Sequence, residues 1–478
     1  MAYNHGIRIQ ENPTSVAAPI ENQGGVPVVF GTAPVNMAAD PAAAVNTPVL
    51  CKTFAEAQAA LGYSNDYANY TLCQAMDAFF KVFGVGPVVF VNVLDPATHK
   101  TTYTETVTVA AGQAKTTSTG VILDGLKVAG GSTDLVADTD YTAEFDTDGT
   151  LIITVLKDGV SSLTLTGNKL DPTAVKAEDV IGGYDAETGA ETGMELLRQV
   201  YPKFNIVPNL LLAPGWSHNP EVGLTMAAKC KGINGVFSCE CVVDLDTTTA
   251  KKYTDVPAAK TEAGYDVSER MVCVWPKVKV AGKIYDFSAI YAAMCVYTDA
   301  NNDGVPNLSP SNRAVNISAT VLADGTEVAL DVVQANTLNA VGVVTAVNVN
   351  GFKAWGNNTA AYPNVTDPKD RWICCRRFFS WWGNSFITTY FNKVDNPANY
   401  RLIESIVDSE NVRGNSLVSQ GKCAGIKMHY NVEDNPVENI MAGRVVFRQS
   451  LAPYTPAEDI LNILEFDVTM IQAALGGE

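Results

Sequence analysis

The stretch that decides the fold is IVPNLLLAPGWSHNPEVGLTMAAKCKGINGVFSCECVVDL, residues 206–245. Residues 206–213 predict a buried strand, and residues 235–245 predict a second strand. The segment between them, 220–231, has the length and apolar spacing of a helix. Another helix is predicted at 247–263 and another strand at 270–280. Strands that alternate with helices in this way predict a mainly parallel sheet covered on both faces, so the fold class is α/β.

The same pattern extends to both sides of this stretch. Upstream, apolar runs at 26–31 and 86–94 predict two buried strands with two helices between them. Downstream, a further helix and further strands complete the alternation near residue 349. We therefore predict one α/β domain formed by residues 21–97 and 186–365.

The residues between these two parts, 98–185, have a different character. Thr, Ser, Gly and Asp dominate, and apolar residues recur at every second position over several short runs, as they do in half-buried strands. The sequence Asp146-Thr147-Asp148-Gly149 separates two of these runs as a hairpin turn would. The segment has 13 acidic residues against 6 lysines. Because the α/β pattern resumes after it, we predict an inserted, acidic all-β module.

Residues 366–454 are predicted to form a separate α+β domain at the C-terminal end. Residues 372–391 form a helical pattern crowded with aromatic side chains, and 400–420 form a second one with Gly414 near its middle. A short strand is expected at 445–448. The chain is thus expected to be multi-domain.

Both ends of the chain have the pattern of a strand without a sheet of its own. In the N-terminal arm, residues 1–20, Ile7 and Ile9 alternate with polar residues until Pro13 ends the run. The C-terminal arm, residues 455–478, alternates more regularly. Its apolar positions are Leu464, Phe466, Val468 and Met470. A single strand has to pair with another, so we predict that both arms carry strands that pair outside their own domain.

The composition excludes several classes of function. The 478 residues carry a formal net charge of −18, which argues against a nucleic-acid-binding protein. No apolar run approaches the roughly 20 residues that span a bilayer, and the first residues lack the basic and apolar segments of a secretory signal. We therefore expect a protein that is made in the cytoplasm, stays soluble and does not insert into a membrane.

Residues with catalytic chemistry do not form a recognisable enzyme motif. Gly84 and Gly86 precede a strand instead of following one, so the dinucleotide-binding fingerprint is not matched. Ser217 and His218 are neighbours in sequence, an arrangement that rarely places a base against its nucleophile. We predict no catalytic residue and no cofactor.

Metal-ligand patterns are equally incomplete. The sequence from Asp299 to Gly304 begins like a calcium loop, but Pro310 stands where the bidentate glutamate should be. The ten cysteines form no CxxC pair, and only four histidines are available, so the cysteines are interpreted as buried apolar thiols. We predict no metal site.

One region is basic in an otherwise acidic chain. Between residues 371 and 430 there are eight Lys and Arg against four Asp and Glu. Arg371, Arg376 and Arg377 lie at the start of the aromatic-rich helix. The region is either a solvated helix face or a surface that docks on an acidic partner.

Several segments in the same order resemble the tail sheath family of contractile phage tails and phage-tail-like bacteriocins. The matching segments are PNLLLAPG at 208–215, DGV with SPSN within 303–312, NGFKAWGNNT at 350–359, and Arg376 with Arg377 where the family opens its C-terminal domain. The resemblance covers residues 21–97 and 186 to the end. The family usually has Arg at the position of Asn358, which weakens the transfer of any specific contact there.

The resemblance implies a structural subunit, not an enzyme. Sheath subunits form homo-oligomers, as stacked hexameric rings or a helix, around an inner tail tube protein, with baseplate and tail terminator proteins as further partners and no nucleic acid. Such a chain would be made in the bacterial host cytoplasm and become part of a virion tail or a phage-tail-like particle. Contraction would drive the tube through the target cell envelope.

The resemblance also assigns roles to particular residues. Terminal arms of one subunit would add strands to a sheet in the C-terminal domain of a neighbour, which explains the half-buried pattern of Ile7 and Ile9 and of the residues from Leu464 to Met470. Arg371, Arg376 and Arg377 would face the tube, and the β insertion would lie outermost.

Two other functions stay open from the sequence. A soluble cytosolic α/β enzyme would need a pocket near the loops around Gly215, Asp244 and Asp246, and it would form a small, discrete oligomer. A tail surface protein would bind glycans through the β module, so removal of residues 98–185 would abolish its function.

Overall fold

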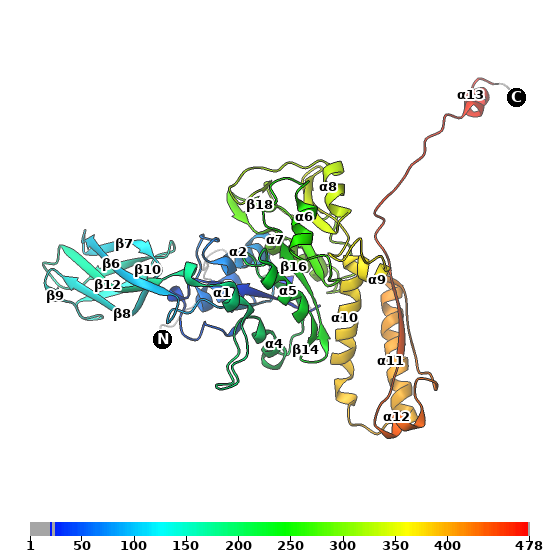
Figure 1. Ribbon diagram of the computed structural model, residues 1–478, viewed down its shortest axis with the longest axis horizontal. Coiled ribbons are helices and arrows are strands. Elements are labelled where there is room, and N and C mark those ends of the chain that lie inside the picture. The colour runs from blue at the N-terminus through cyan, green and yellow to red at the C-terminus, as the bar shows by residue number, and fades with distance from the viewer. Residues whose placement is uncertain (1–19, 22–23, 477–478) are drawn as a thin grey trace, which may run out of the picture.

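The computed structural model describes residues 20–21 and 24–476, so Ile7 and Ile9 of the N-terminal arm lie outside the described residues. The molecule is elongated, with the β module at one end, an α/β body in the middle and a helical unit at the other end (Figure 1). The C-terminal arm leaves the helical unit as an extended segment (Figure 1). The prediction of a mixed α/β chain built from several sheets is confirmed.

The body is organised around an eight-stranded sheet, counted within the described residues. Its order is β22-β21-β17-β16-β13-β2-β5-β3. Six neighbouring strands run parallel: β2 (Val26–Gly31), β5 (Val88–Asn92), β13 (Pro208–Leu212), β16 (Glu240–Asp244), β17 (Met271–Val274) and β21 (Val343–Asn348). The antiparallel strands β3 (Pro48–Cys51) and β22 (Phe352–Trp355) form its two edges.

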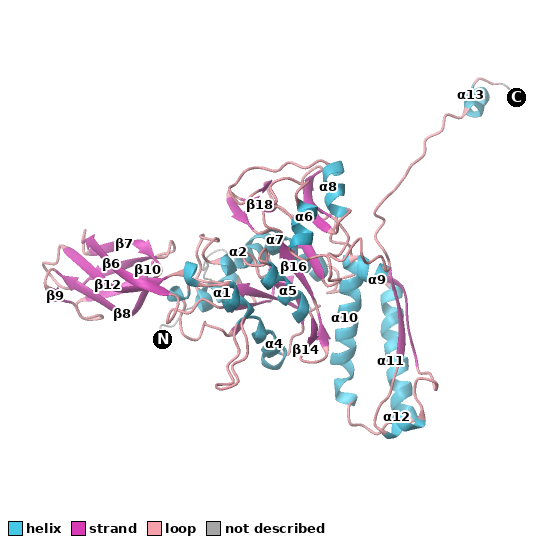
Figure 2. Ribbon diagram, in the orientation of Figure 1, coloured by secondary structure: helices cyan, strands magenta, loops and turns pink. Residues whose placement is uncertain are grey.

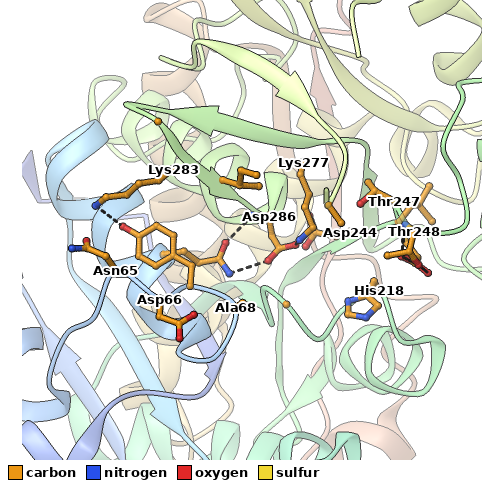
Figure 3. A pocket seen from close by; sticks show the side chains of 18 residues that line it. Asn65, Asp66, Ala68, His218, Asp244, Thr247, Thr248, Lys277, Lys283 and Asp286 are labelled. Atoms are coloured by element: carbon orange, nitrogen blue, oxygen red, sulfur yellow. Dashed lines mark hydrogen bonds and ion pairs between the residues drawn. The ribbon is translucent and has the colours of Figure 1, made fainter. Parts of the chain in front are cut away.

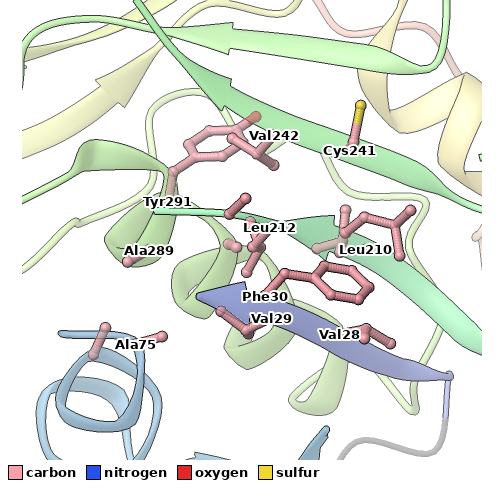
Figure 4. Close-up of a cluster of buried hydrophobic side chains, with 14 of the residues drawn as sticks. Val28, Val29, Phe30, Ala75, Leu210, Leu212, Cys241, Val242, Ala289 and Tyr291 are labelled. Carbon is pink, nitrogen blue, oxygen red and sulfur yellow. The ribbon is translucent and has the colours of Figure 1, made fainter. Parts of the chain in front are cut away.

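Helices cover both faces of this sheet. All six residues of β2 are buried, and since side chains alternate between faces along a strand, neither face is open to solvent. The central helix α7 (Phe287–Ala300) is apolar nearly all round and is buried along most of its length. Phe30, Leu212 and Tyr291 belong to the same cluster of buried side chains (Figure 4). Burial of each such side chain contributes about 1.5–3 kcal/mol.

The remaining helices of the body are shorter. They are α1 (Phe54–Leu61), α2 (Thr71–Asp77), α4 (Leu197–Phe204), α5 (Pro220–Lys229), α6 (Val256–Glu262) and α8 (Val332–Asn339). The short helix α3 (Ala177–Ile181) lies within the predicted insertion and packs on α5. Small strands complete the body: β1 (Ile20–Glu21) with β4 (Val85–Gly86), β14 (Lys231–Ile233) with β15 (Phe237–Ser238), and β18 (Lys277–Val280) between β19 (Lys283–Tyr285) and β20 (Ala319–Val321).

Two predicted elements of the body are shorter than expected. The strand expected at 235–245 is divided into β15 and β16. The helix expected from 247 begins only at Val256, where Pro257 lies in the first turn. Proline lacks the N–H that an interior helical position needs, and its fixed φ suits the first turn, so it favours a helix start at this point.

The β module consists of two small sheets packed on each other (Figure 2). One has the order β6-β12-β8-β9 and the other β10-β11-β7. The strands are β6 (Lys100–Thr108), β7 (Gln113–Thr119), β8 (Val121–Gly130), β9 (Thr133–Asp134), β10 (Tyr141–Phe145), β11 (Thr150–Val155) and β12 (Ser162–Leu170). Leu151, Ile153 and Leu163 belong to a core of its own, distinct from that of the body. The predicted hairpin turn at Asp146 joins β10 to β11.

The C-terminal unit pairs two long helices with a β-ribbon. After α9 (Pro368–Arg371) come α10 (Ile373–Tyr390) and α11 (Tyr400–Ser419), which run side by side (Figure 2). The ribbon consists of β23 (Cys423–His429) and β24 (Arg448–Pro453), with α12 (Val437–Met441) between them. The strand predicted at 445–448 is thus displaced toward the C-terminus. β23 was not predicted.

Gly414 of α11 lets the ribbon approach the helix. A Cβ at this position would lie 2.8 Å from Cβ of Ile426, closer than real contacts allow, and 3.1 Å from the Ile426 carbonyl oxygen. The absence of a side chain at Gly414 therefore permits β23 to lie against α11. This explains a glycine in the interior of a helix, where it otherwise costs about 1 kcal/mol relative to alanine.

Candidate functional site

Two of the three arginines that were expected to face a tube lie in the interior. Arg376 and Arg377 are 8% and 4% exposed. Both come from the start of α10, where that helix packs on the amino ends of the central strands. The prediction of a tube-facing role for Arg376 and Arg377 is wrong, because a guanidinium in the interior requires an anionic partner, and both find one in their own chain.

The most deeply buried ion pair joins Arg377 to Asp299 of α7. Both oxygens of Asp299 accept hydrogen bonds from the guanidinium, and the two side chains are almost completely buried. Burial raises the pKa of Asp299, and Arg377 offsets only part of this shift. The pair connects α10 to the core. It also occupies the carboxylate that would have been the first ligand of the calcium-like loop.

Glu240, the first residue of β16, connects the sheet to the same helix. Its Oε1 atom accepts a hydrogen bond from Ser380 at 2.5 Å and one from Arg270 at 3.3 Å, and Nε of Arg376 lies 3.9 Å away. Burial raises the pKa of Glu240 to about 7, although the neighbouring guanidinium groups act to lower it. The sequence held a signal that was overlooked, since a glutamate inside an apolar strand has to find polar partners.

Arg371 lies closer to the surface and contacts the root of the C-terminal arm. One terminal nitrogen is 3.0 Å from Oε2 of Glu458, and Nε donates to Oδ1 of Asn358 at 2.9 Å. The guanidinium also lies over the rings of Tyr362 and Trp372. The tube-facing role of Arg371 stays a prediction, since its side chain is 25% exposed although groups of its own chain hold it.

A cavity of about 670 Å³ lies at the opposite, carboxyl edge of the sheet (Figure 3). Gly215, Asp244 and Asp246 line it, so the pocket required by the enzyme hypothesis exists. Ligands of α/β proteins commonly bind at the carboxyl ends of the strands. The bonding of the polar groups decides whether this cavity could support catalysis.

The buried carboxylate at this edge is already fully bonded. Asp244 accepts hydrogen bonds from Oγ of Ser217 at 3.0 Å and from the backbone and hydroxyl of Ser288 at 2.9 and 2.5 Å. Burial and the nearby Asp286 raise the pKa of Asp244 to about 6. Because Ser217 donates its proton to Asp244, it is not placed as a nucleophile activated by His218.

The second carboxylate of the cavity forms an internal ion pair. Asp286 contacts the ammonium group of Lys277 and accepts a hydrogen bond from Gln74 at 2.9 Å. Burial acts to raise the pKa of Asp286, but Lys277 lowers it below its ordinary value. These bonds join α2, α7 and β18. The charges of Lys277 and Asp286 therefore serve as structural contacts between these elements.

The cysteines support no metal site. All ten lie within the described residues, and each is a buried, free thiol. No group of three or more His, Cys, Asp or Glu side chains in the described part of the chain is arranged to hold a metal ion.

The C-terminal arm exposes a dense set of apolar side chains. Leu464 and Phe466 are 87% and 83% exposed. The segment from Val468 to Ala474 forms a short helix, α13, in which the Asp467 side chain accepts from the backbone N–H of Thr469. The strand predicted over 464–470 is therefore absent from the single chain. An isolated strand leaves its backbone groups unpaired, whereas a helical turn pairs its own.

The β-ribbon of the C-terminal unit has open edges. Within the described residues, β23 and β24 pair only with each other, so each has an outer edge without a neighbouring strand. Helix α11 covers the face on which Ile426 and Met428 are buried. An edge strand presents a row of unpaired N–H and C=O groups to which another strand can add.

Comparison with known proteins gives a consistent result. No family model matches the chain. The tail sheath protein of Burkholderia phage BcepMu is 28% identical, and the match covers 99% of both chains. The major tail sheath protein of Serratia phage KSP20 is 27% identical over 64% of this chain and 76% of its own.

A solved structure shares the fold. It is the PVC sheath complex of an extracellular contractile injection system in the contracted state, with a TM-score of 0.58. The sequence identity is 15%, and the match covers 98% of this chain and 99% of the other. At this identity the likeness concerns the fold alone.

Proposed function

We infer that this chain is a contractile tail sheath protein, a structural subunit of a phage tail or a phage-tail-like particle. The observation that carries this conclusion is the match to a phage tail sheath protein over almost the full length of both chains. The likeness in fold to a sheath complex agrees with it. The resemblance noted in the sequence is thereby confirmed, and the subunit is one that assembles into a polymeric sheath.

We propose that subunits stack as hexameric rings or a helix around an inner tail tube, with baseplate and tail terminator proteins at the ends. The shape of the chain supports this, since the acidic β module (98–185) and the C-terminal unit (366–454) lie at opposite ends of the body (Figure 1). The β module would face outward, where its charge favours solubility. The C-terminal unit would form the inner wall, and the body (21–97 with 186–365) the layer between them.

We propose that the arms link neighbouring subunits by strand exchange. The exposed residues Leu464, Phe466, Val468 and Met470 would form a strand only when paired with the ribbon of another copy. The open edges of β23 and β24 offer the required backbone groups. Ile7 and Ile9 would do the same from the N-terminal arm. Such links would act as hinges while the bodies rotate during contraction.

The proposed mechanism needs neither catalysis nor a cofactor. Energy would be stored in a metastable extended lattice and released when the subunits reach better-matched contacts. The internally bonded groups of the carboxyl-edge cavity support a non-enzymatic role. No helix in the described part of the chain is long and apolar enough to cross a membrane. We propose synthesis in the bacterial host cytoplasm.

Electron microscopy of the purified chain tests the assembly. Hollow, striated tubes are expected from the full chain, and their loss is expected when residues 1–20 or 455–478 are removed. Compact particles of one size from all three proteins would contradict strand exchange.

A pair of substitutions on opposite faces of the predicted strand sharpens this test. Phe466→Asp places a charge on the apolar face and should abolish tubes, because a buried unpaired carboxylate is costly. Thr469→Asp adds the same charge to the other face and should leave tubes intact. Equal loss in both variants would argue against an added strand.

A further inference from the structure

The root of the C-terminal arm lies beside a second cavity, of about 520 Å³, on the side of the body. Pro456, Ala457, Glu458 and Asp459 form one wall of this cavity. Glu458 points to Arg371 and Asn357, whose nitrogen atoms lie 3.0 and 3.4 Å from its two carboxylate oxygens. We propose that Arg371 and Asn357 form a carboxylate-binding site whose ligand is Glu458. This site would fix the point at which the C-terminal arm becomes free.

The site is held in place by contacts besides those to Glu458. The Arg371 guanidinium lies 3.9 Å from the Trp372 ring centre and 4.5 Å from that of Tyr362, and Asn358 accepts from its Nε. Such contacts hold the planar guanidinium in one orientation before a carboxylate arrives. Both oxygens of Glu458 are then engaged.

The asparagines of the site are also fixed. Oδ1 of Asn357 accepts from Ser309 at 2.5 Å, which turns the amide nitrogen of Asn357 toward Glu458. Asn358 donates to the carbonyl of Asn339 at 3.2 Å, so its oxygen faces Arg371. Both asparagines are less than a tenth exposed. A carboxylate that enters therefore meets donors that are already oriented.

Glu458 shortens the mobile part of the arm. Leu464 lies six positions beyond Glu458, so a neighbour's ribbon must lie within about 20 Å of the site. Without the contact, the nearest remaining bond in the described residues is the one that the Tyr454 carbonyl accepts from Cys375, ten positions before Leu464. The effective concentration of a tethered segment falls roughly as the −3/2 power of tether length, which predicts a decrease of about two- to threefold.

This inference rests on the proposed strand exchange for its effect on assembly, but the site itself can be tested in the unassembled chain. A nitroxide on Leu461→Cys reports the motion of the arm, and the native cysteines, all buried, leave this position as the reactive one. In the full chain, Glu458→Gln should shift the spectrum toward faster motion. Asp459→Asn is the matched control, since Asp459 makes no ion pair or hydrogen bond within the described residues. Identical spectra for the two variants would overturn the proposal.

The concentration at which tubes form gives the second readout. Sedimentation should show a two- to threefold increase for Glu458→Gln and none for Asp459→Asn. Arg371→Lys keeps the charge but loses the planar fork, so it should reproduce the effect of Glu458→Gln, and the double variant should be no worse than either single variant. Equal increases in Glu458→Gln and Asp459→Asn would show a general charge effect and contradict the site.

The two proposals fail in different ways. If a chain lacking residues 460–478 still forms tubes, strand exchange is wrong, while the spin-label result continues to decide the carboxylate site. If that chain fails to assemble but Glu458→Gln leaves both arm motion and assembly unchanged, the arm functions without the site.

Discussion

Helix α10 and the C-terminal arm belong to the same part of the chain and are both rich in apolar side chains, but they differ in where those side chains are buried. In α10, Phe378 and Trp382 are 0% and 2% exposed, and Arg377 pairs with Asp299 of the body. In the arm, Phe466 is 83% exposed. The difference separates two uses of apolar sequence: α10 contributes stability to its own subunit, whereas the arm keeps its apolar surface for another copy.

The largest effect on this comparison is expected from the buried ion pair of α10. Asp299→Asn leaves Arg377 buried without an anion, which should lower the free energy of unfolding by about 3–5 kcal/mol. Chemical denaturation followed by tryptophan fluorescence would measure it. Asp303→Asn removes an 85% exposed carboxylate from Lys422, which keeps its hydrogen bond to the Asn302 carbonyl, so it should cost much less. An equal loss in the free energy of unfolding for both variants would contradict the larger contribution expected of the buried pair.

The next effect is a pH dependence that originates at Glu240. Its pKa is raised to about 7 in the folded chain from an ordinary value near 4.5. The folded state therefore holds this proton more tightly, so its contribution to stability is complete below pH 4.5 and is lost as the pH rises toward 7. The loss corresponds to about 3 kcal/mol at most.

Glu240→Gln removes this titration. Between pH 5 and 7.5 the variant should lose less stability than the unmodified chain, as measured by denaturation at both pH values. Glu187→Gln, at an exposed loop position, should follow the unmodified chain. A parallel decrease in all three proteins would mean that Glu240 stays ionised throughout this range.

Two helical glycines provide a matched test of packing within the C-terminal unit. Gly414→Ala should destabilise the chain by about 1–3 kcal/mol, because the added methyl group meets Ile426. Gly383→Ala in α10 adds its methyl group to open space and should stabilise the chain by about 0.5–1 kcal/mol. Thermal unfolding of the two variants should therefore shift in opposite directions. A shift in the same direction would contradict the close contact between α11 and β23.

The smallest effect on stability is expected from the arm. Removal of residues 460–478 should change the free energy of unfolding of the unassembled chain by less than about 0.5 kcal/mol, because its apolar side chains contact solvent. The measurement is denaturant unfolding at a concentration below that of assembly. A clear destabilisation would show that the arm packs on its own subunit, and the contrast with α10 would be lost.

Patterns of local sequence predicted much of the architecture. The strand patterns at 206–213 and 235–245 predicted the parallel sheet. The alternation of apolar and polar residues within 98–185 predicted the strands of the β module. These elements are predictable because periodicity depends on near neighbours in the chain. The ribbon partner β23 was missed, since its alternation is weak and its strand forms against α11.

The ion pairs could not be predicted in the same way. Arg377 and Asp299 are 78 residues apart, and Arg371 and Glu458 are 87 apart. The sequence showed a basic region and left open whether it was a solvated face or a docking surface. Only the folded chain shows that the three arginines at its start bind acids of their own subunit.

The sequence by itself determined the α/β class, the inserted acidic module and the apolar character of the arms, because each follows from residue type and spacing along a short stretch. The tertiary structure decided which charges are internal, which carboxylates of the cavity are bonded and which apolar residues stay exposed. The physical reason is that a charge or an apolar side chain acquires its free energy from its surroundings, and those surroundings come from segments far away in the chain.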